Sequence, residues 1–233
     1  MISIKQFRYA ADNLAYLIYA KKRAMAVDGG AWPDILEFIA RNDLILEYVA
    51  NTHCHYDHTP GNDELLKRSK AKYLEISSLT GGEEISLGSD KITIIRTPGH
   101  SLDSTCFYTG AAVITGDTLF NGTIGNCFTG DLKAFFMSIK QLMSLPADTL
   151  IYAGHDYWMD SLAFAGYLEP ENADLESFRA LYNPRNVCST LAWEFRINPY
   201  LRFNEITIIN LLKKRNLPRR TEWERWESLM SVD

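Results

Sequence analysis

Long apolar runs are absent from this sequence of 233 residues, which excludes a membrane-spanning helix of about 18 uncharged apolar residues. The apolar stretch from Leu14 to Ala20 is short and is followed by three basic residues. An excess of positive charge is also absent: 24 Lys and Arg stand against 29 Asp and Glu, for a net charge of -5. Because phosphate binding draws on an excess of Lys and Arg, nucleic acid is not the expected partner. We therefore expect a soluble, cytoplasmic protein that binds neither a membrane nor nucleic acid.

Cysteine is scarce as well, with four residues that form no C-x-x-C pair. They are widely spaced, at Cys54, Cys106, Cys127 and Cys188. This spacing excludes a disulfide framework and a zinc ribbon, and it fits the reducing cytosol. Histidine is nearly as rare, with five residues. Because the count is so small, the positions of the histidines decide what the sequence predicts.

The first half of the chain alternates short β-rich runs with helical stretches, which is typical of a layered α/β protein. Strands are predicted at 14–19, 23–27, 44–49, 91–96, 111–115 and 149–152, and helices at 32–41 and 62–70. From about Tyr167, apolar residues recur at helical spacing over 175–182 and 206–212, and 223–230 mixes tryptophan with charged residues. We therefore predict a catalytic α/β domain over residues 1–166. A helical C-terminal region over 167–233 is expected to pack over its substrate cleft.

One predicted strand runs directly into a cluster of three histidines and an aspartate within six residues: His53, His55, Asp57 and His58. Imidazole and carboxylate are good ligands for zinc and other divalent transition ions. In an extended segment His53 and His55 point the same way, so they can share one metal ion. Asp57 and His58 lie past a bend and can face a second ion.

Three further candidate ligands follow predicted strands in the same manner. His100, Asp117 and His155 each come after a β-run and a glycine. Strand-end loops often carry functional sites because the sheet fixes their geometry. A lone histidine is more often an ordinary core or surface residue than a ligand, but no histidine in this chain lies outside the pattern. The four loops are therefore predicted to meet at one sheet edge, where Asp117 can span two metal ions about 3.5–4 Å apart.

These motifs resemble the metallo-β-lactamase superfamily and, more narrowly, glyoxalase II, the hydroxyacylglutathione hydrolases. The motifs that carry the resemblance are Thr52–Asn62, Thr97–His100, Thr115–Phe120 and Ala153–Tyr157. Three later stretches resemble the C-terminal helical domain of that family, namely Leu168–Asn172, Ser189–Phe195 and Asn198–Arg202. The resemblance therefore extends over nearly the whole chain.

The resemblance implies an αββα sandwich, two sheets face to face with helices outside, with a C-terminal helical extension. It implies two divalent metal ions, with zinc as the first expectation and iron or manganese as alternatives. The implied ligands are His53, His55 and His100 for one ion and Asp57, His58 and His155 for the other, with Asp117 bridging.

The reaction that the resemblance implies is hydrolysis of a thioester such as S-lactoylglutathione to a hydroxy acid and a free thiol. A metal-bridging hydroxide would attack the carbonyl, and Asp57 would hydrogen-bond to that hydroxide as the catalytic side chain. Because a thiolate leaves readily, no dedicated general acid is needed. The expected partner is therefore a small-molecule thioester of glutathione or of another thiol. The chain itself is expected to be a monomer or a small homo-oligomer.

The thiol-recognition residues depart from the glyoxalase II pattern, which has a Lys and a Tyr after the bridging Asp, a Tyr after the last His and a C-terminal Arg-x-x-Lys. Asn126 and Phe128 stand where that first Lys and Tyr are expected, and Glu222 replaces the last Lys. The candidate substrate-binding residues are Tyr157, Asn126, Phe128, Arg219 and Arg220. Asp28 resembles a family position near the site and is expected to have a structural role.

Two accounts of these departures stay open. The enzyme either takes glutathione thioesters through other cations or acts on another acyl thiol or ester. Two other functions also fit the sequence. One is a persulfide dioxygenase with a single iron on His53, His100 and Asp117, and the other is a metal-binding protein on the same fold with an altered substrate.

Overall fold

The strands of the computed structural model, which describes residues 2–232, form two sheets. The first has the order β1-β2-β3-β4-β5, formed by Ser3–Tyr9, Asn13–Ala20, Arg23–Val27, Ile45–Ala50 and Lys72–Tyr73. The second has the order β11-β10-β9-β8-β7-β6. From β6 to β11 its strands are Glu84–Leu87, Asp90–Arg96, Thr105–Tyr108, Ala112–Gly116, Leu150–Ala153 and Ser189–Thr190. A short 3₁₀ turn, Ile76–Ser78, precedes β6.

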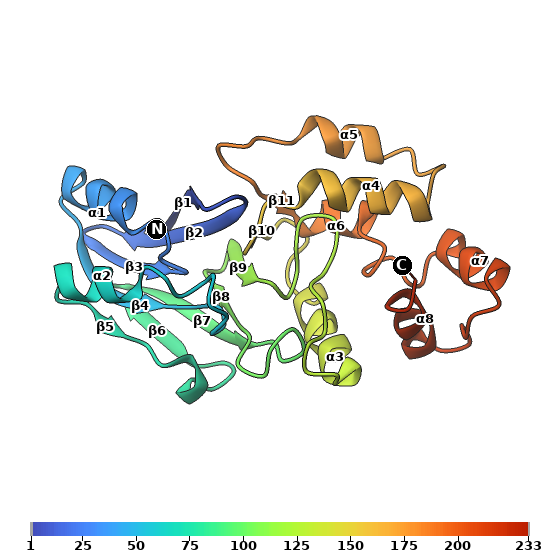
Figure 1. Cartoon of the computed structure of the whole chain (residues 1–233), viewed down its shortest axis with the longest axis horizontal. Coiled ribbons are helices and arrows are strands. Elements are labelled where there is room, and N and C mark those ends of the chain that lie inside the picture. The colour runs from blue at the N-terminus through green and yellow to red at the C-terminus, as the bar shows by residue number, and fades with distance from the viewer. Residues whose placement is uncertain (1, 233) are drawn as a thin grey trace.

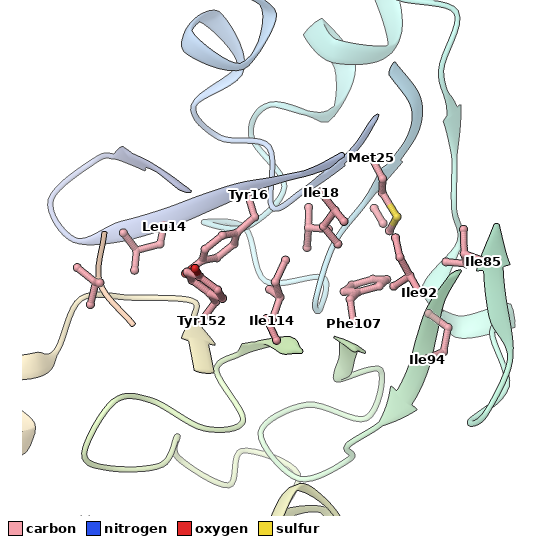
Figure 2. Close-up of a cluster of buried hydrophobic side chains, with 14 of the residues drawn as sticks. Leu14, Tyr16, Ile18, Met25, Ile85, Ile92, Ile94, Phe107, Ile114 and Tyr152 are labelled. Carbon is pink, nitrogen blue, oxygen red and sulfur yellow. The ribbon is translucent and has the colours of Figure 1, made fainter. Parts of the chain in front are cut away.

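The two sheets pack face to face through a core of aliphatic and aromatic side chains. Strand β2 is buried along almost its whole length because its two faces meet different layers. Tyr16 points toward Tyr152, and Ile18 points toward Ile114 and Phe107, all in the second sheet (Figure 2). Leu17 points the other way, into a separate cluster under the helices. The near-continuous apolar run of β2 therefore reflects a central strand covered on both sides.

Helices cover the outer face of each sheet (Figure 1). Helices α1 (Trp32–Arg41) and α2 (Asn62–Arg68) bury Ile35 and Leu65 against the first sheet. Helix α3 (Leu132–Met143) buries Phe135 and Ile139 against Val113 of the second. The order helix, sheet, sheet, helix confirms the αββα sandwich that the family resemblance implies. Helix α1 has the predicted bounds, and its Pro33 occupies the first turn, where no backbone donor is lost.

Five helices follow the sandwich: α4 (Trp158–Leu168), α5 (Leu175–Ala180), α6 (Leu191–Ile197), α7 (Ile206–Lys214) and α8 (Glu222–Leu229). They share the core of the second sheet, since Trp226 of α8 contacts the rings of Phe135 and Phe136 at centroid distances of 5.8 and 5.4 Å. Strand β11 pairs with β10 and forms the edge of that sheet. Helix α4 is continuous through the boundary expected after residue 166. Within residues 2–232, no helix is both long enough and apolar enough to cross a membrane.

Candidate metal centre

The candidate ligands lie just beyond the ends of four strands. The 53–58 segment follows β4 of the first sheet, and His100, Asp117 and His155 follow β7, β9 and β10 of the second. Strands β9 and β10 are parallel, so their carboxyl ends meet at the same edge. The sequence prediction that the four loops converge therefore has a simple basis in the topology.

Three imidazoles form the first group of the centre. His53 Nε2 lies 2.9 Å from His55 Nδ1, which lies 3.1 Å from His100 Nε2. His53 is almost fully buried and His55 is partly exposed. Three nitrogens that converge this closely form one face of a coordination site.

The second group consists of a carboxylate and two imidazoles. Asp57 Oδ2 lies 3.3 Å from His155 Nε2 and 3.7 Å from His58 Nε2. The three ligand atoms lie within 4.8 Å of one another, as do those of the first group. The structure thus brings together the two sets of residues that the resemblance pairs.

Asp117 lies between the two groups. Its Oδ2 is 3.6 Å from His100 Nε2 and 3.5 Å from His155 Nε2. Its Oδ1 is 3.4 Å from His58 Nε2. A carboxylate that faces imidazoles of both groups is suited to bridge two cations.

The chemistry of the donor set fits divalent metal ions. His58 Nε2 and Asp117 Oδ1 are buried and have no hydrogen-bond partner among the described residues. Buried polar atoms are costly unless a partner satisfies them. A metal ion would satisfy both atoms, and imidazole nitrogen with carboxylate oxygen suits zinc, iron and manganese alike.

In four of the five histidines, the ring nitrogen that points away from the centre also has a hydrogen-bond partner. The hydrogen-bonded pairs are His53 with Thr52, His58 with Asp28, His100 with the Asn126 carbonyl, and His155 with Asp12. Such partners fix the orientation and tautomer of a ligating histidine. Asp28, which is fully buried, also accepts hydrogen bonds from the backbone N–H and hydroxyl of Thr52. Asp28 therefore holds the start of the loop at Thr52 as well as the His58 ring.

The electrostatics of the two groups differ. Burial, reinforced by nearby His58, lowers the pKa of His53 to about 4. Burial opposes the charged form of His58 too, but Asp28 and Asp117 outweigh it and raise the pKa of His58 to about 11. Although burial disfavours its ionised form, the neighbouring imidazoles of His155 and His58 hold the pKa of Asp117 well below its ordinary value. His53 is therefore neutral near pH 7, which leaves its Nε2 lone pair free for a cation, and Asp117 is ionised.

A pocket opens over the centre, and three of the five predicted substrate residues line it. Phe128, two-thirds exposed, places its ring 5.1 Å from that of His100. Tyr157 stacks on His155 at 5.0 Å, with the two rings nearly parallel. Asn126 is exposed at the rim. Tyr56 and Phe120 add two more aromatic rings to the lining.

Arg219 and Arg220 lie elsewhere. They line a different surface pocket, together with Pro218 and Glu224. Their backbone carbonyls accept hydrogen bonds from Arg225, which ties this turn to helix α8 rather than to the metal pocket. Glu222, which replaces the C-terminal Lys of the family pattern, pairs with Lys140 at 3.1 Å and with Asn204 at 2.8 Å.

Comparison with known proteins identifies the family. A sequence profile of the metallo-beta-lactamase superfamily matches residues 9–78 and 75–155, and one named hydroxyacylglutathione hydrolase C-terminus matches 156–230. The hydroxyacylglutathione hydrolase of Pseudoalteromonas translucida (strain TAC 125) is 32% identical over 250 aligned residues, covering 100% of this chain and 97% of its own. The chain belongs to the hydroxyacylglutathione hydrolase family. The predicted thioester hydrolase of glyoxalase II type is thereby confirmed.

Further relatives support the same assignment and the fold. The hydroxyacylglutathione hydrolase of Idiomarina loihiensis is 35% identical over 220 residues, with 87% of each chain covered. Among solved structures, ETHE1 from Myxococcus xanthus superposes with a TM-score of 0.69 and 26% identity, covering 93% of this chain and 92% of its own. The B3 metallo-beta-lactamase BLEG-1 superposes with a TM-score of 0.65 and 22% identity, over 85% of this chain and 99% of its own. The two family profiles meet at residue 155, so the family's own division falls before helix α4.

Residues 9–13 are the part of the site that sequence reasoning missed. Tyr9, Asp12 and Asn13 belong to the β1–β2 hairpin and contact the second group of ligands. No metal-binding motif marks them. The only local signal is that two polar residues stand immediately before the apolar run of β2.

Proposed function

We propose that this member of the hydroxyacylglutathione hydrolase family holds two divalent metal ions and hydrolyses S-(2-hydroxyacyl)glutathione, with S-lactoylglutathione as the type substrate. The observation that carries the proposal is the position of Asp117 between two separate groups of ligands. A centre for one ion would not need six further ligand side chains at one sheet edge.

When bound, two divalent ions lower the pKa of water and polarise a carbonyl held against them. The carboxylate of Asp57 borders the pocket and can accept a hydrogen bond from the attacking water, which aims its lone pair. All five histidines face the centre, so none is left as a separate proton shuttle. Phe120, Phe128 and Tyr157 form aromatic walls of the pocket, which limit the access of water to a bound thioester.

Within its described lining, the pocket offers no basic side chain to the anionic thiol portion of the substrate. Among the described residues that line it there is no lysine or arginine. We therefore propose that aromatic contact with Phe128 and Tyr157 and hydrogen bonding to Asn126 hold the thiol portion, with little contribution from ion pairs. The consequence is weak discrimination between glutathione and other thiols.

The test is steady-state kinetics on the purified protein together with elemental analysis. We expect two metal ions per chain, release of thiol from S-lactoylglutathione, loss of activity with a chelator and recovery on addition of Zn²⁺. One iron per chain with oxygen consumption in the presence of glutathione persulfide would replace the proposal with the dioxygenase alternative. Absence of hydrolysis of every thioester tried would leave the metal-binding alternative.

A further inference from the structure

The turn between β1 and β2 docks against the loop that carries His155. Leu14 N–H donates to the Gly154 carbonyl at 2.8 Å, and Asp156 N–H donates to the Asp12 carbonyl at 2.9 Å. Asn13 and His155 form an isolated antiparallel bridge. The N-terminal hairpin of one sheet is thus joined by its backbone to the end of β10 in the other.

Side chains of the same hairpin contact ligands of the second group. Asp12 Oδ1 lies 2.8 Å from His155 Nδ1, and Asn13 Nδ2 lies 3.2 Å from Asp57 Oδ2. The Tyr9 hydroxyl donates to the Asp57 carbonyl at 2.7 Å. Among the described hydrogen bonds of this hairpin, none reaches the three histidines of the first group.

We propose that Asp12 and Asn13 are positioning residues that set the affinity of the second metal position, an inference that rests on the proposed binuclear function. A proton on His155 Nδ1 donated to Asp12 leaves the Nε2 lone pair facing Asp57 and Asp117. The Asn13 amide, which is buried, donates to the same Asp57 oxygen that faces both imidazoles. Two ligands contributed by distant segments are thereby aimed at one point.

The hairpin is also docked by contacts that involve neither the Asp12 nor the Asn13 side chain. The backbone bonds around Asp12 hold the turn, and Arg8 pairs with Asp156 on the same surface. The Asp12 side chain is 39% exposed and contributes nothing to the core. A role for Asp12 in metal affinity is therefore separable from a role in folding, and Arg8 provides a matched control.

The experiment is titration of the metal-free protein with Co²⁺, followed by visible absorption, with elemental analysis after dialysis. For Asp12→Ala we expect the second binding step to weaken by about 10- to 100-fold while the first is unchanged. Asp12→Asn keeps an oxygen that accepts from Nδ1–H and should recover part of the loss. Arg8→Ala should bind both ions as the wild type does. Asn13→Ala should lower the second affinity relative to the first, a ratio that general destabilisation does not shift.

Three results would overturn the inference. Asp12→Ala with an unchanged second step would show that His155 is positioned without its partner. Arg8→Ala with an equal loss would assign the effect to hairpin docking. A wild-type protein that binds one ion would refute the binuclear function itself. Because this result is obtained before any variant is examined, failure of the binuclear function can be distinguished from failure of the positioning role of Asp12 and Asn13.

Discussion

Asn126 is the residue at which the charge of the substrate can be tested most directly. It is exposed at the rim of a pocket whose described lining has no basic side chain, and its backbone carbonyl is what His100 Nδ1 contacts. Substitution of the side chain therefore leaves that hydrogen bond in place.

We expect Asn126→Lys to lower KM for S-lactoylglutathione by about tenfold, equivalent to about 1.4 kcal/mol, with kcat unchanged. The reason is a new charge-assisted contact with a carboxylate of the thiol portion. The measurement is kcat and KM at low and high salt, since screening should remove the gain. Asn126→Gln and a lactoyl thioester of an uncharged thiol are the controls, and an equal gain in either would contradict the electrostatic explanation.

At the scale of elements, the turn after β10 depends on the absence of a side chain at Gly154. A Cβ atom there would lie 2.2 Å from Asp117 Oδ1 and 2.9 Å from His58 Cε1. The close approach of β9 and β10 at their ends is thus what brings the Asp117 carboxylate next to the loop that carries His155.

Gly154→Ala is expected to displace Asp117 and reduce the bound metal from two ions per chain, with a matching loss of thioesterase activity. Gly166→Ala is a suitable control, because its Cβ would meet nothing closer than 3.6 Å and alanine favours helix α4 by up to about 1 kcal/mol. The measurements are the metal content of both variants by elemental analysis and their melting temperatures by thermal melts. Full metal content in Gly154→Ala would show that the centre tolerates a shift of the bridge.

Helix α6 holds the loop after β9 through a buried carboxylate. Glu194 accepts hydrogen bonds from Gly122 N–H at 2.9 Å, Asn198 Nδ2 at 3.0 Å and the Ser189 hydroxyl. Because burial disfavours its charged form, the pKa of Glu194 rises from 4.5 to about 7. The C-terminal region thus contacts the segment between Asp117 and the pocket residue Asn126 through a titratable group.

The pH dependence of stability follows from this shift. Between about pH 4.5 and 7 the folded protein retains a proton on Glu194 that the unfolded chain releases. The free energy of unfolding therefore falls as pH rises through 7. Glu194→Gln should remove this part of the decline, because an amide does not titrate in this range. The fold should be kept, since the amide can donate to Ser189 and accept from the other two partners. Urea unfolding of both proteins at pH 5 and pH 8 measures the difference. An unchanged slope would mean that Glu194 is ionised throughout.

The sequence predicted that the candidate metal ligands converge, because each lies within a few residues of a strand end and local sequence patterns mark both the strands and the ligands. It also predicted the central strands and α1, whose apolar patterns are strong. It did not predict β1, whose side chains alternate between partly buried and exposed, or the role of Asp12. The contact between Asp12 and His155 joins residues 143 positions apart. Arg219 and Arg220 were assigned by sequence position alone, and the path of the chain into α8 places them at another surface.

At the scale of the whole molecule, the C-terminal helices and the sandwich share one core. Trp226 packs on α3, and β11 completes the second sheet. We therefore propose that the two regions unfold together, and we expect a single calorimetric transition. Saturating Zn²⁺ should raise its midpoint, because ions that bind only the folded state stabilise it. Two resolved transitions, with Zn²⁺ shifting only one, would identify the helical region as an independent unit.

The position of the candidate centre at the seam of the sandwich has a further consequence. One set of ligands follows β4 in the first sheet, while His100, Asp117 and His155 extend from the second. A pair of ions held there would act as a non-covalent cross-link between the layers, in addition to the apolar core and the backbone hydrogen bonds of the β1–β2 hairpin. Release of metal would then convert this edge of the protein into its most readily opened part, where backbone amides exchange and proteases gain access first.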